Sequence, residues 1–478
     1  MESISSGPLI GARHLQTLLL FLAIAVNYAT RLNIAVSLVA MTDAKTTNPN
    51  FYEFDWTEKQ KSYILSSFFW GYTVSQIPGG YAARRFGVKK TILIATFIGA
   101  LLGLAIPFCV FWGGWQIFSV IRILQGLTQG ILFPCVYQHL AKWSPEKERN
   151  RLGVLAHSGI ECGTIVAMYL TGMVAASDLG WPGISYVFSG IGIVFSLFWL
   201  IFAENTPADS KFITAAERSY IISSQASVED AQRKKKNIPV PWKAILTSVP
   251  FISVFIAKVC DTCGFMTMQA QIPSYLHGAL KMEITNNAFY SALPYMTMLL
   301  CLFIFMISAD VVLKKKWASL LVVRKTCNTI AMWGPAALLI GIGLLNETQR
   351  TLAITFITLN VGLNAGHVIG NLLNLIDLSP NHSGILMAFA NTFVSIIALV
   401  SPLVVGMIVH DVNDRSQWQI VFWIAAGLFI LGNLQYLFFA QTDTQPWNDE
   451  DFMTKGDKEK GEKVTERPSE ASLSMKVF

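Results

Sequence analysis

The chain alternates between long apolar segments and shorter polar stretches. Twelve of the apolar segments are about 20 residues long, the length of a helix that crosses the hydrocarbon core of a bilayer. They are centred near Val26, Tyr72, Leu101, Gly126, Val166, Ile193, Gly264, Leu299, Ala336, Leu363, Val394 and Phe429. A polar stretch with four consecutive basic residues, 233–236, separates the first six segments from the second six. The pattern predicts an all-α integral membrane protein with twelve transmembrane helices in two six-helix halves.

Shifts in composition divide the chain into five parts. We expect a cytoplasmic N-terminal tail at 1–14, six-helix halves at 15–203 and 247–440, a cytoplasmic linker at 204–246 and a cytoplasmic tail at 441–478. The second tail is rich in Asp, Glu, Lys and Ser, which is typical of a disordered segment. Asn346 begins a glycosylation sequon in a loop expected outside the cytoplasm and close to the bilayer.

The composition excludes an ordinary soluble protein. Hydrophobic residues make up 53% of the chain, charged residues make up 14%, and the mean hydropathy is +0.47. The seven cysteines are scattered and fall mostly in apolar runs, so we expect buried thiols without disulfides. Cys260 and Cys263 form a single Cys-x-x-Cys pair with no further ligand set, and we expect no metal centre there.

Lysine and arginine are unevenly distributed between the loops. Outside the spans, the odd-numbered loops contain six of them, Lys45, Lys59, Lys61, Lys281, Arg350 and Arg415, and the termini and even-numbered loops contain the rest. By the positive-inside rule, this asymmetry predicts that both termini are cytoplasmic. The net charge of +6 therefore follows from topology and requires no nucleic-acid partner.

Two arginines lie inside apolar segments. Arg122 is in the fourth span, with Gln125 and Gln129 on the same helix face, and Arg31 is in the first span beside Asn27. A charge at bilayer depth costs roughly 2.5–3.5 kcal/mol or more, so it persists only beside a partner or a wet cavity. The alternatives are an arginine that extends to the interface and one neutralised by a structural carboxylate.

Further ionisable residues occur in two other spans. In the fifth span, His157, Glu161 and Thr164 share one helix face. Glu161 and His157 could form a proton-coupling pair, or Glu161 could be the counter-ion of an arginine. In the seventh span, Lys258 and Asp261 have a spacing at which they can neutralise each other, which favours a structural role.

The tenth span carries a stripe of hydrogen-bonding side chains. On a regular helix, Asn360, Asn364, His367, Asn371 and Asn374 lie within about 80° of one face. The stripe could bind helices together, but its length favours a wet cavity. A separate glycine stripe is suited to close packing against another helix, at Gly362, Gly366 and Gly370.

The polar residues together indicate a binding site for an anion. Two intramembrane arginines lie in one half of the chain with few carboxylates to pair them. Guanidinium groups offer planar, bidentate hydrogen bonds to carboxylate and phosphate. In transporters that are built from two helical halves, the substrate site lies between the halves near the bilayer midplane. The sequence therefore predicts an anion transporter.

Five stretches of the sequence resemble signature motifs of the solute carrier family 17 anion transporters, within the major facilitator superfamily. They are YATRLNIAVSLVAM, SFFWGYTVSQIPGGYAARRFG, RILQGLTQG, KWSPEKERNRL and NLIDLSPNHSGILMAFANT. The likeness extends from about Leu15 to Trp447. The family includes vesicular glutamate transporters, the lysosomal sialic acid transporter and type I sodium/phosphate cotransporters. The resemblance implies the twelve-helix major facilitator fold.

The resemblance assigns roles to several residues. It implies that Arg31 and Arg122 bind the anion, and it matches Asn374, Asp377 and Asn391 to the family's functional positions in the tenth and eleventh spans.

The chain also departs from the family pattern. Proton-coupled members have a glutamate where this chain has Gln129, and vesicular glutamate transporters have an arginine where it has Asp261 and a histidine where it has Leu65. These departures argue against glutamate as the substrate and favour the sodium/phosphate branch. The superfamily's usual loop aspartate is replaced by Arg84 in the first half, whereas Asp310 retains a gating role in the second.

We therefore predict a secondary active transporter of inorganic phosphate or an organic anion that works by alternating access. The predicted substrate site comprises Arg31, Arg122, Asn364, His367, Asn371, Asn374 and Asn391. His157, Glu161 and Gln129 are the predicted coupling residues, and Asp310, Lys258 and Asp261 the gating or structural charges.

Sodium symport is favoured over a proton-coupled organic anion transporter of lysosomes or vesicles. A non-transporting membrane receptor of the same fold is a third interpretation. No phosphate loop or nucleophile constellation indicates an enzyme. We expect a monomer in the plasma membrane or a lysosomal or vesicular membrane, with no cofactor besides the coupling Na⁺ or H⁺.

Overall fold

The computed structural model describes residues 10–42, 48–224, 240–278, 284–345, 349–409, 414–449 and 452. The first group of helices comprises α1 (Ala12–Thr42), α3 (Glu58–Phe86), α4 (Val88–Gln129), α5 (Leu132–Trp143), η1 (Glu146–Glu148), α6 (Arg149–His157), α7 (Gly159–Ala176) and α8 (Gly180–Phe202). The second group comprises α12 (Val249–Gly278), α13 (Ile284–Lys314), α14 (Leu320–Leu344), α15 (Arg350–Asn364), η3 (Val368–Leu372), α16 (Asn374–Leu378), α17 (Ser383–Ile408) and α18 (Arg415–Phe439). Three shorter helices lie outside these groups, α9 (Ala215–Ser224), α11 (Trp242–Leu246) and η4 (Pro446–Asn448).

All twelve predicted segments fall on these helices, although only ten stretches of the described residues are long and apolar enough to count as membrane spans. One stretch of 56 residues, Val88–Trp143, contains both the third and the fourth segments, and non-helical backbone at Gly113 and Gly114 separates them within α4. The second segment, α3, is 29 residues long but is too polar to pass. The predicted basic run at 233–236 and the sequon at 346–348 lie outside the described residues, as does most of both tails.

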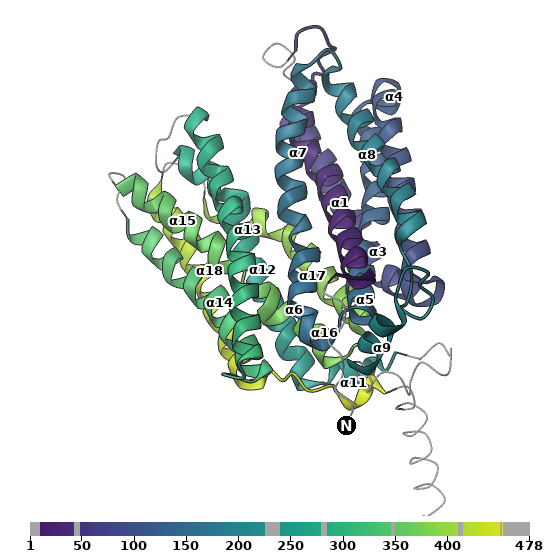
Figure 1. Ribbon diagram of the computed structural model, residues 1–478. Helices are drawn as coiled ribbons and strands as arrows, with labels where there is room; N and C mark the ends of the chain where they lie inside the picture. The colour runs from purple at the N-terminus through teal and green to yellow at the C-terminus, as the bar shows by residue number, and fades with distance from the viewer. Residues whose placement is uncertain are drawn as a thin grey trace, which may run out of the picture.

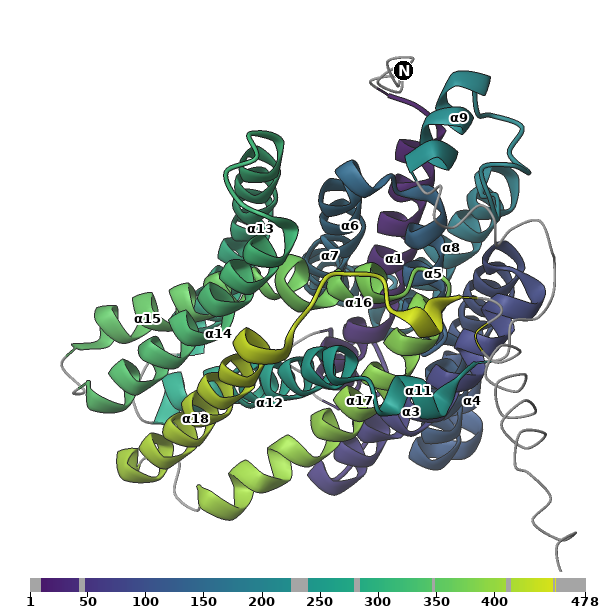
Figure 2. The same cartoon turned by 90° about the horizontal axis from the view of Figure 1, so that it is seen from below.

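The two groups of helices converge at the end of the molecule where α1 begins and diverge towards the other end (Figure 1). We call the former the terminal end. Within the first group α3 packs on α4 and α1 on α7, and within the second α14 and α12 pack on α18. Between the groups, α17 contacts α3 and α5, and α13 contacts α6. The segment that follows α18 crosses the terminal end towards the first group (Figure 2).

Glycines allow α3 and α4 to touch along their backbones. A Cβ atom at Gly126 would lie 2.1 Å from the carbonyl oxygen of Phe68, and one at Gly71 would lie 2.0 Å from that of Ile123. This contact fixes Phe68 against the part of α4 that carries Arg122.

The glycines of the tenth span have the predicted packing role. Cβ atoms at Gly362, Gly366 and Gly370 would meet Thr297 of α13, Cys327 of α14 and Asn328 of α14, respectively, all within 3.0 Å. The sequence prediction of a close-packed glycine stripe is confirmed.

Charged side chains join the two groups at the terminal end. Asp377 of α16 accepts a hydrogen bond from Arg149 Nη1 of α6 at 2.6 Å and another from Arg324 Nε of α14 at 2.8 Å. Arg324 Nη1 also donates to Asn150 Oδ1 at 2.8 Å. Asp377 and Arg324 are buried, so each ion's hydrogen bonds replace its lost hydration. The network ties α6 of the first group to α14 and α16 of the second.

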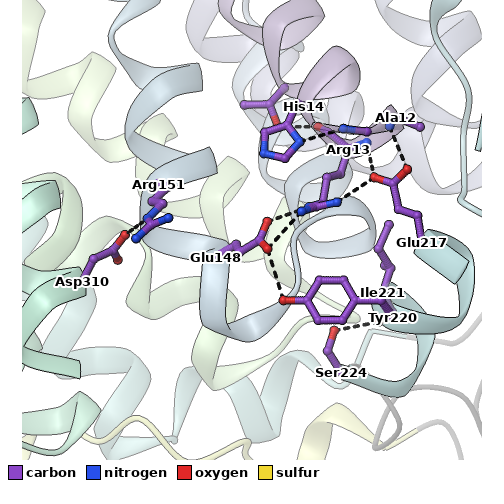
Figure 3. Close-up of polar contacts among 12 residues, drawn as sticks. Ala12, Arg13, His14, Glu148, Arg151, Glu217, Tyr220, Ile221, Ser224 and Asp310 are labelled. Atoms are coloured by element: carbon purple, nitrogen blue, oxygen red, sulfur yellow. Dashed lines mark hydrogen bonds and ion pairs between the residues drawn. The ribbon is translucent and has the colours of Figure 1, made fainter. Parts of the chain in front are cut away.

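Two further contacts extend this closure. Arg151 forms an ion pair with Asp310 at the end of α13 (Figure 3). Arg84 lies 3.4 Å from His382 Nδ1 across the groups. Burial, with a contribution from Arg84, lowers the pKa of His382 to about 3, so the imidazole is neutral and can accept this hydrogen bond.

A separate charged cluster holds the helix α9 against the first group. Arg13 at the start of α1 pairs with Glu148 at 2.6 Å and with Glu217 of α9 at 2.9 Å (Figure 3). The Tyr220 hydroxyl of α9 donates to Glu148 at 3.1 Å. Glu148 directly precedes Arg149, so the segment that closes the terminal end is braced on its other side by α1 and α9.

We expect Gly126→Ala to destabilise the protein, because its methyl group would overlap the backbone of α3 and force the helices apart. Overpacking of this kind costs typically about 1–3 kcal/mol. The melting temperature in detergent should fall. Gly190→Ala on α8 is the control, since nothing lies within 4 Å of its Cβ position. Equal melting temperatures for both variants would contradict the close approach of α3 and α4.

We expect Asp377→Asn to open the terminal end, because it removes the charge that holds Arg149 and Arg324 together. Ser383 is buried at the junction of the groups, where its hydroxyl lies 3.4 Å from the carbonyl of Tyr137. A Ser383→Cys reporter should react faster with a polar maleimide when Asp377→Asn is also present. Asp209→Asn, in the linker, should leave the rate unchanged, and an unchanged rate with Asp377→Asn would exclude this closure role.

Candidate functional site

A cavity of about 490 Å³ lies between the two helix groups. This volume falls in the range of small-molecule sites. Both groups contribute its polar and charged lining, with Arg31, Arg122, His157, Glu161 and Thr164 from the first group and Lys258, Asp261, Asn364, His367 and Asn391 from the second. Most of the predicted site residues therefore come together in one place, although they span 360 positions of the sequence.

Arg31 projects from α1 into a cage of aromatic rings. Its guanidinium carbon lies 5.4 Å from the ring centroid of Tyr28, 5.0 Å from Phe68, 4.9 Å from Phe69 and 5.1 Å from Tyr72. Within the described part of the chain, no carboxylate lies within 4.0 Å of this guanidinium. The ring faces stabilise the positive charge without neutralising it.

Arg122 lies on α4 and is only 2% exposed. Its Nη1 donates to Gln125 Oε1 at 3.0 Å, whereas its Nε has no hydrogen-bond partner. Its guanidinium carbon lies 4.8 Å from the centroid of Phe68, the ring that Arg31 also faces. No carboxylate of the described residues pairs with it. The cavity thus holds two neighbouring positive charges that lack an acidic partner.

The fifth span brings the predicted His157, Glu161 and Thr164 to the cavity wall. Glu161 is buried, and its Oε2 has no hydrogen-bond partner. The structure shows no ion pair between Glu161 and an arginine of the described chain, so a counter-ion role receives no support in this conformation. The ring of His157 meets that of His367 edge to face, with centroids 5.9 Å apart, across the two groups.

Lys258 and Asp261 both line the cavity but do not form the direct ion pair that their spacing allows. The Asp261 carboxylate instead accepts a hydrogen bond from Asn364 Nδ2 at 2.7 Å. Among the described residues, the two side chains therefore interact electrostatically without a direct ion pair in this conformation. The structural role that their spacing favours stays a prediction.

The asparagine stripe of the tenth span is divided between two roles. Asn364 and His367 line the cavity. Asn371 and Asn374 do not line the cavity. Asn371 donates to Asn328 Oδ1 at 3.0 Å, and Asn374 donates to the Tyr436 hydroxyl at 2.8 Å. Likewise, Asn360 donates to the carbonyl of Pro335 at 3.0 Å. The prediction of a continuous wet face is wrong for these three.

The backbone explains the positions of Asn371 and Asn374. The tenth span is not one regular helix, because α15 ends at Asn364 and the π-helix η3 follows after a turn. A π-turn adds a residue, so it rotates the side chains that follow away from the face expected for 3.6 residues per turn. Asn371 and Asn374 consequently face α14 and α18.

Three other predicted residues lie elsewhere. Gln129 is outside the central cavity, and its Nε2 donates to Thr30 Oγ1 at 3.1 Å. Asp310 pairs with Arg151 at the terminal end, where Asp377 also lies, and its gating role stays a prediction. Among the described residues, no group of three or more His, Cys, Asp or Glu side chains could hold a metal ion.

Sequence reasoning did not identify the aromatic cage or the arginines of the closure. The cage rings at positions 68, 69 and 72 follow one another at helical spacing in the second span, a signal that packing alone could produce. Arg324 follows the basic turn after α13 and resembles an ordinary charge at the start of a helix.

Comparison with known proteins agrees with this architecture. A model of the Major Facilitator Superfamily matches residues 20–402. A Drosophila melanogaster protein named "Putative inorganic phosphate cotransporter" is 33% identical, covering 94% of this chain and 88% of its own. Human sialin is 31% identical, covering 91% of this chain and 90% of its own, and human vesicular glutamate transporter 2 is 31% identical, covering 91% and 75%.

Solved structures show the same fold. The proton:xylose symporter XylE superposes with a TM-score of 0.69 at 16% identity, over 92% of this chain and 98% of its own. The Escherichia coli fucose:proton symporter FucP has a TM-score of 0.61 at 15% identity, over 90% and 100%. The fold and the relatives agree with the motif resemblance. This chain belongs to the Major Facilitator Superfamily and, within it, to solute carrier family 17.

Proposed function

We propose that the protein transports a small anion by alternating access, with Arg31 and Arg122 as the residues that bind it. One observation carries the proposal, namely two guanidinium groups that lack an acidic partner in the described chain and line a cavity between the helix groups. An anion supplies the missing negative charge. Asn364, His367 and Asn391 line the same cavity and can donate further hydrogen bonds.

The proposed substrate is inorganic phosphate or an organic anion. Both present oxygens that match the planar fork of a guanidinium. Arg31 and Arg122 share the ring of Phe68, so both can reach a single small anion. A relative named for inorganic phosphate cotransport supports phosphate, and sialin and a vesicular glutamate transporter as relatives support organic anions.

The proposed orientation places the terminal end in the cytoplasm. The ion pairs of Asp377 and Asp310 then close the cytoplasmic side, whereas the helix groups diverge on the opposite side (Figure 1). Transport requires these contacts to break while the diverging ends of the helix groups come together. Bilayer lipid is the only other partner in this proposal, and the protein acts as a monomer.

We propose sodium as the coupling ion, because Gln129 is an amide and cannot carry a proton at this position. The second candidate is proton coupling through Glu161. It is favoured by one observation, the buried Oε2 of Glu161 without a hydrogen-bond partner at the cavity wall. A non-transporting receptor predicts that the cavity's polar groups are paired internally, and the two arginines do not fit that picture.

We expect Arg122→Ala to weaken phosphate uptake into proteoliposomes strongly. Loss of one partner of a buried, charged hydrogen bond costs about 2–5 kcal/mol, or about 30-fold or more in affinity. Arg122→Lys should retain part of the uptake, because lysine keeps the charge but loses the bidentate fork. Arg85→Ala, an exposed arginine outside the cavity, is the control. Unchanged uptake by Arg122→Ala would overturn the site assignment.

We expect uptake to follow an imposed sodium gradient and to survive Glu161→Gln, since sodium coupling requires no titrating carboxyl at that position. Sodium and pH gradients should be imposed separately on the same vesicles. Uptake that ignores sodium, follows the pH gradient and disappears in Glu161→Gln would establish proton coupling in place of sodium symport. Thr164→Val, also at the cavity wall, controls for disturbance of α7.

A further inference from the structure

We propose that a small chamber inside the first helix group binds one monovalent cation, Na⁺, through the side-chain oxygens of Gln129 and Asn27. The inference rests on the proposed sodium-coupled function and gives the coupling ion a location. The chamber lies among α1, α4 and α8, apart from the central cavity, and has a volume of about 30 Å³. A water molecule needs about 10–15 Å³, so the space suits one ion with a water molecule.

Five side chains of the lining carry oxygen, and none of the lining side chains is ionisable. Its polar members are Asn27, Thr30, Thr96, Thr128 and Gln129, and the remainder are apolar or glycine. Hard cations prefer oxygen ligands. Neutral oxygens cannot offset two charges in a medium of low dielectric constant, so the set favours a monovalent ion over a divalent one.

The hydrogen bonds of Thr30 fix the orientation of the Gln129 amide. The Thr30 hydroxyl donates its single hydrogen to its own helix, with the carbonyls of Val26 and Asn27 at 3.0 and 2.9 Å. Its oxygen can therefore only accept from Gln129, 3.1 Å away, and the amide must present nitrogen to it. The oxygen Oε1 of Gln129 is then left buried without a partner, on a side chain that is 6% exposed.

Asn27 supplies a second amide without a partner. The residue is 8% exposed, its side chain lines the chamber, and it makes no hydrogen bond with the described residues. Of these two amides, Gln129 has the atom that is both fully buried and without a partner, and such atoms are uncommon because each forfeits its hydration. An unpartnered oxygen fixed as an acceptor indicates a ligand that is a donor or a cation, and the Asn27 amide lies at the same chamber.

A second small chamber lies between this site and the anion cavity. It shares Thr30, Gly99 and Ala100 with the cation chamber, and it shares Ile34 and Arg122 with the central cavity. Its two unpartnered groups, Nε of Arg122 and Nε1 of Trp181, are both donors. This second chamber therefore repels a cation, which is held only at the Gln129 end.

The arrangement links the two ions electrostatically. Without an anion, the charges of Arg31 and Arg122 disfavour a cation nearby. A bound anion removes that repulsion, so it should raise the affinity for Na⁺, and Na⁺ must raise the affinity for the anion by the same factor. Mutual stabilisation of this kind is what symport requires.

The test is the binding of radioactive sodium to the purified full-length protein, with and without inorganic phosphate. Phosphate should raise Na⁺ affinity several-fold in the wild type. Gln129→Met, which keeps the length of the side chain but has no amide, and Asn27→Leu should each lower Na⁺ affinity at least about tenfold. Asn360→Ala removes a buried amide in the other helix group and is the matched control. Melting temperatures show whether each variant folds.

The outcomes separate the cation site from the proposed function. Wild-type Na⁺ affinity in both folded variants, or no Na⁺ binding by the wild type with phosphate present, would overturn the cation site. Uptake that still depends on Arg122 would in that case leave anion transport intact. Arg122→Ala should bind Na⁺ without any effect of phosphate. If it transports phosphate as the wild type does, the anion site fails independently of where Na⁺ binds.

Discussion

The uncompensated positive charge of Arg31 and Arg122 is the constraint on which the cavity depends. Burying an arginine without a carboxylate is costly, and aromatic faces offset part of that cost. A cation–π contact contributes about 0.5–1 kcal/mol when exposed and about 2 when desolvated, and Arg31 has four such rings within 5.4 Å. Because a ring carries no net charge, it holds the guanidinium in place without competing with an anion for it.

The carboxylates that pair with arginines lie at the terminal end of the molecule. At the terminal end, Asp377 and Asp310 each bind an arginine of the opposite helix group, and Asp377 also binds Arg324 of its own group. Glu148 and Glu217 share Arg13. At the centre, Asp261 is bound by an amide, and the arginines there have no acidic partner in the described chain. Paired charges therefore close one end of the molecule, while unpaired charges define the cavity. Arginines with a carboxylate partner thus hold the terminal end together, whereas arginines without one in the described chain can bind an anion.

Apolar length and the presence of charges within it were sufficient to predict the twelve helices and the positions of Arg31, Arg122, Glu161 and His157 at one cavity. Neither the apolar length of a segment nor a charge within it depends on the exact rotation of the helix, so these predictions tolerate small deviations in helix geometry. The predictions for Asn371 and Asn374 required an unbroken helical period, which the π-helix interrupts.

Tertiary contacts account for the features that the sequence did not reveal. Asp261 is bound by Asn364, a residue over 100 positions away in the sequence. The cage around Arg31 likewise depends on the backbone contact of α3 with α4, which brings the ring of Phe68 to both arginines.

One face of α4 connects the parts of the proposed mechanism. Arg122 faces the anion cavity, Gln125 three residues later holds its guanidinium, and Gln129 seven residues later faces the small chamber. Positions i, i+3 and i+7 share a helix face, so these groups form one rigid row. Binding at either end then acts on the other through charge alone, without a conformational relay. In this proposal, the seven-residue spacing of Arg122 and Gln129 on one membrane-spanning helix is sufficient to couple the binding of an anion and a cation.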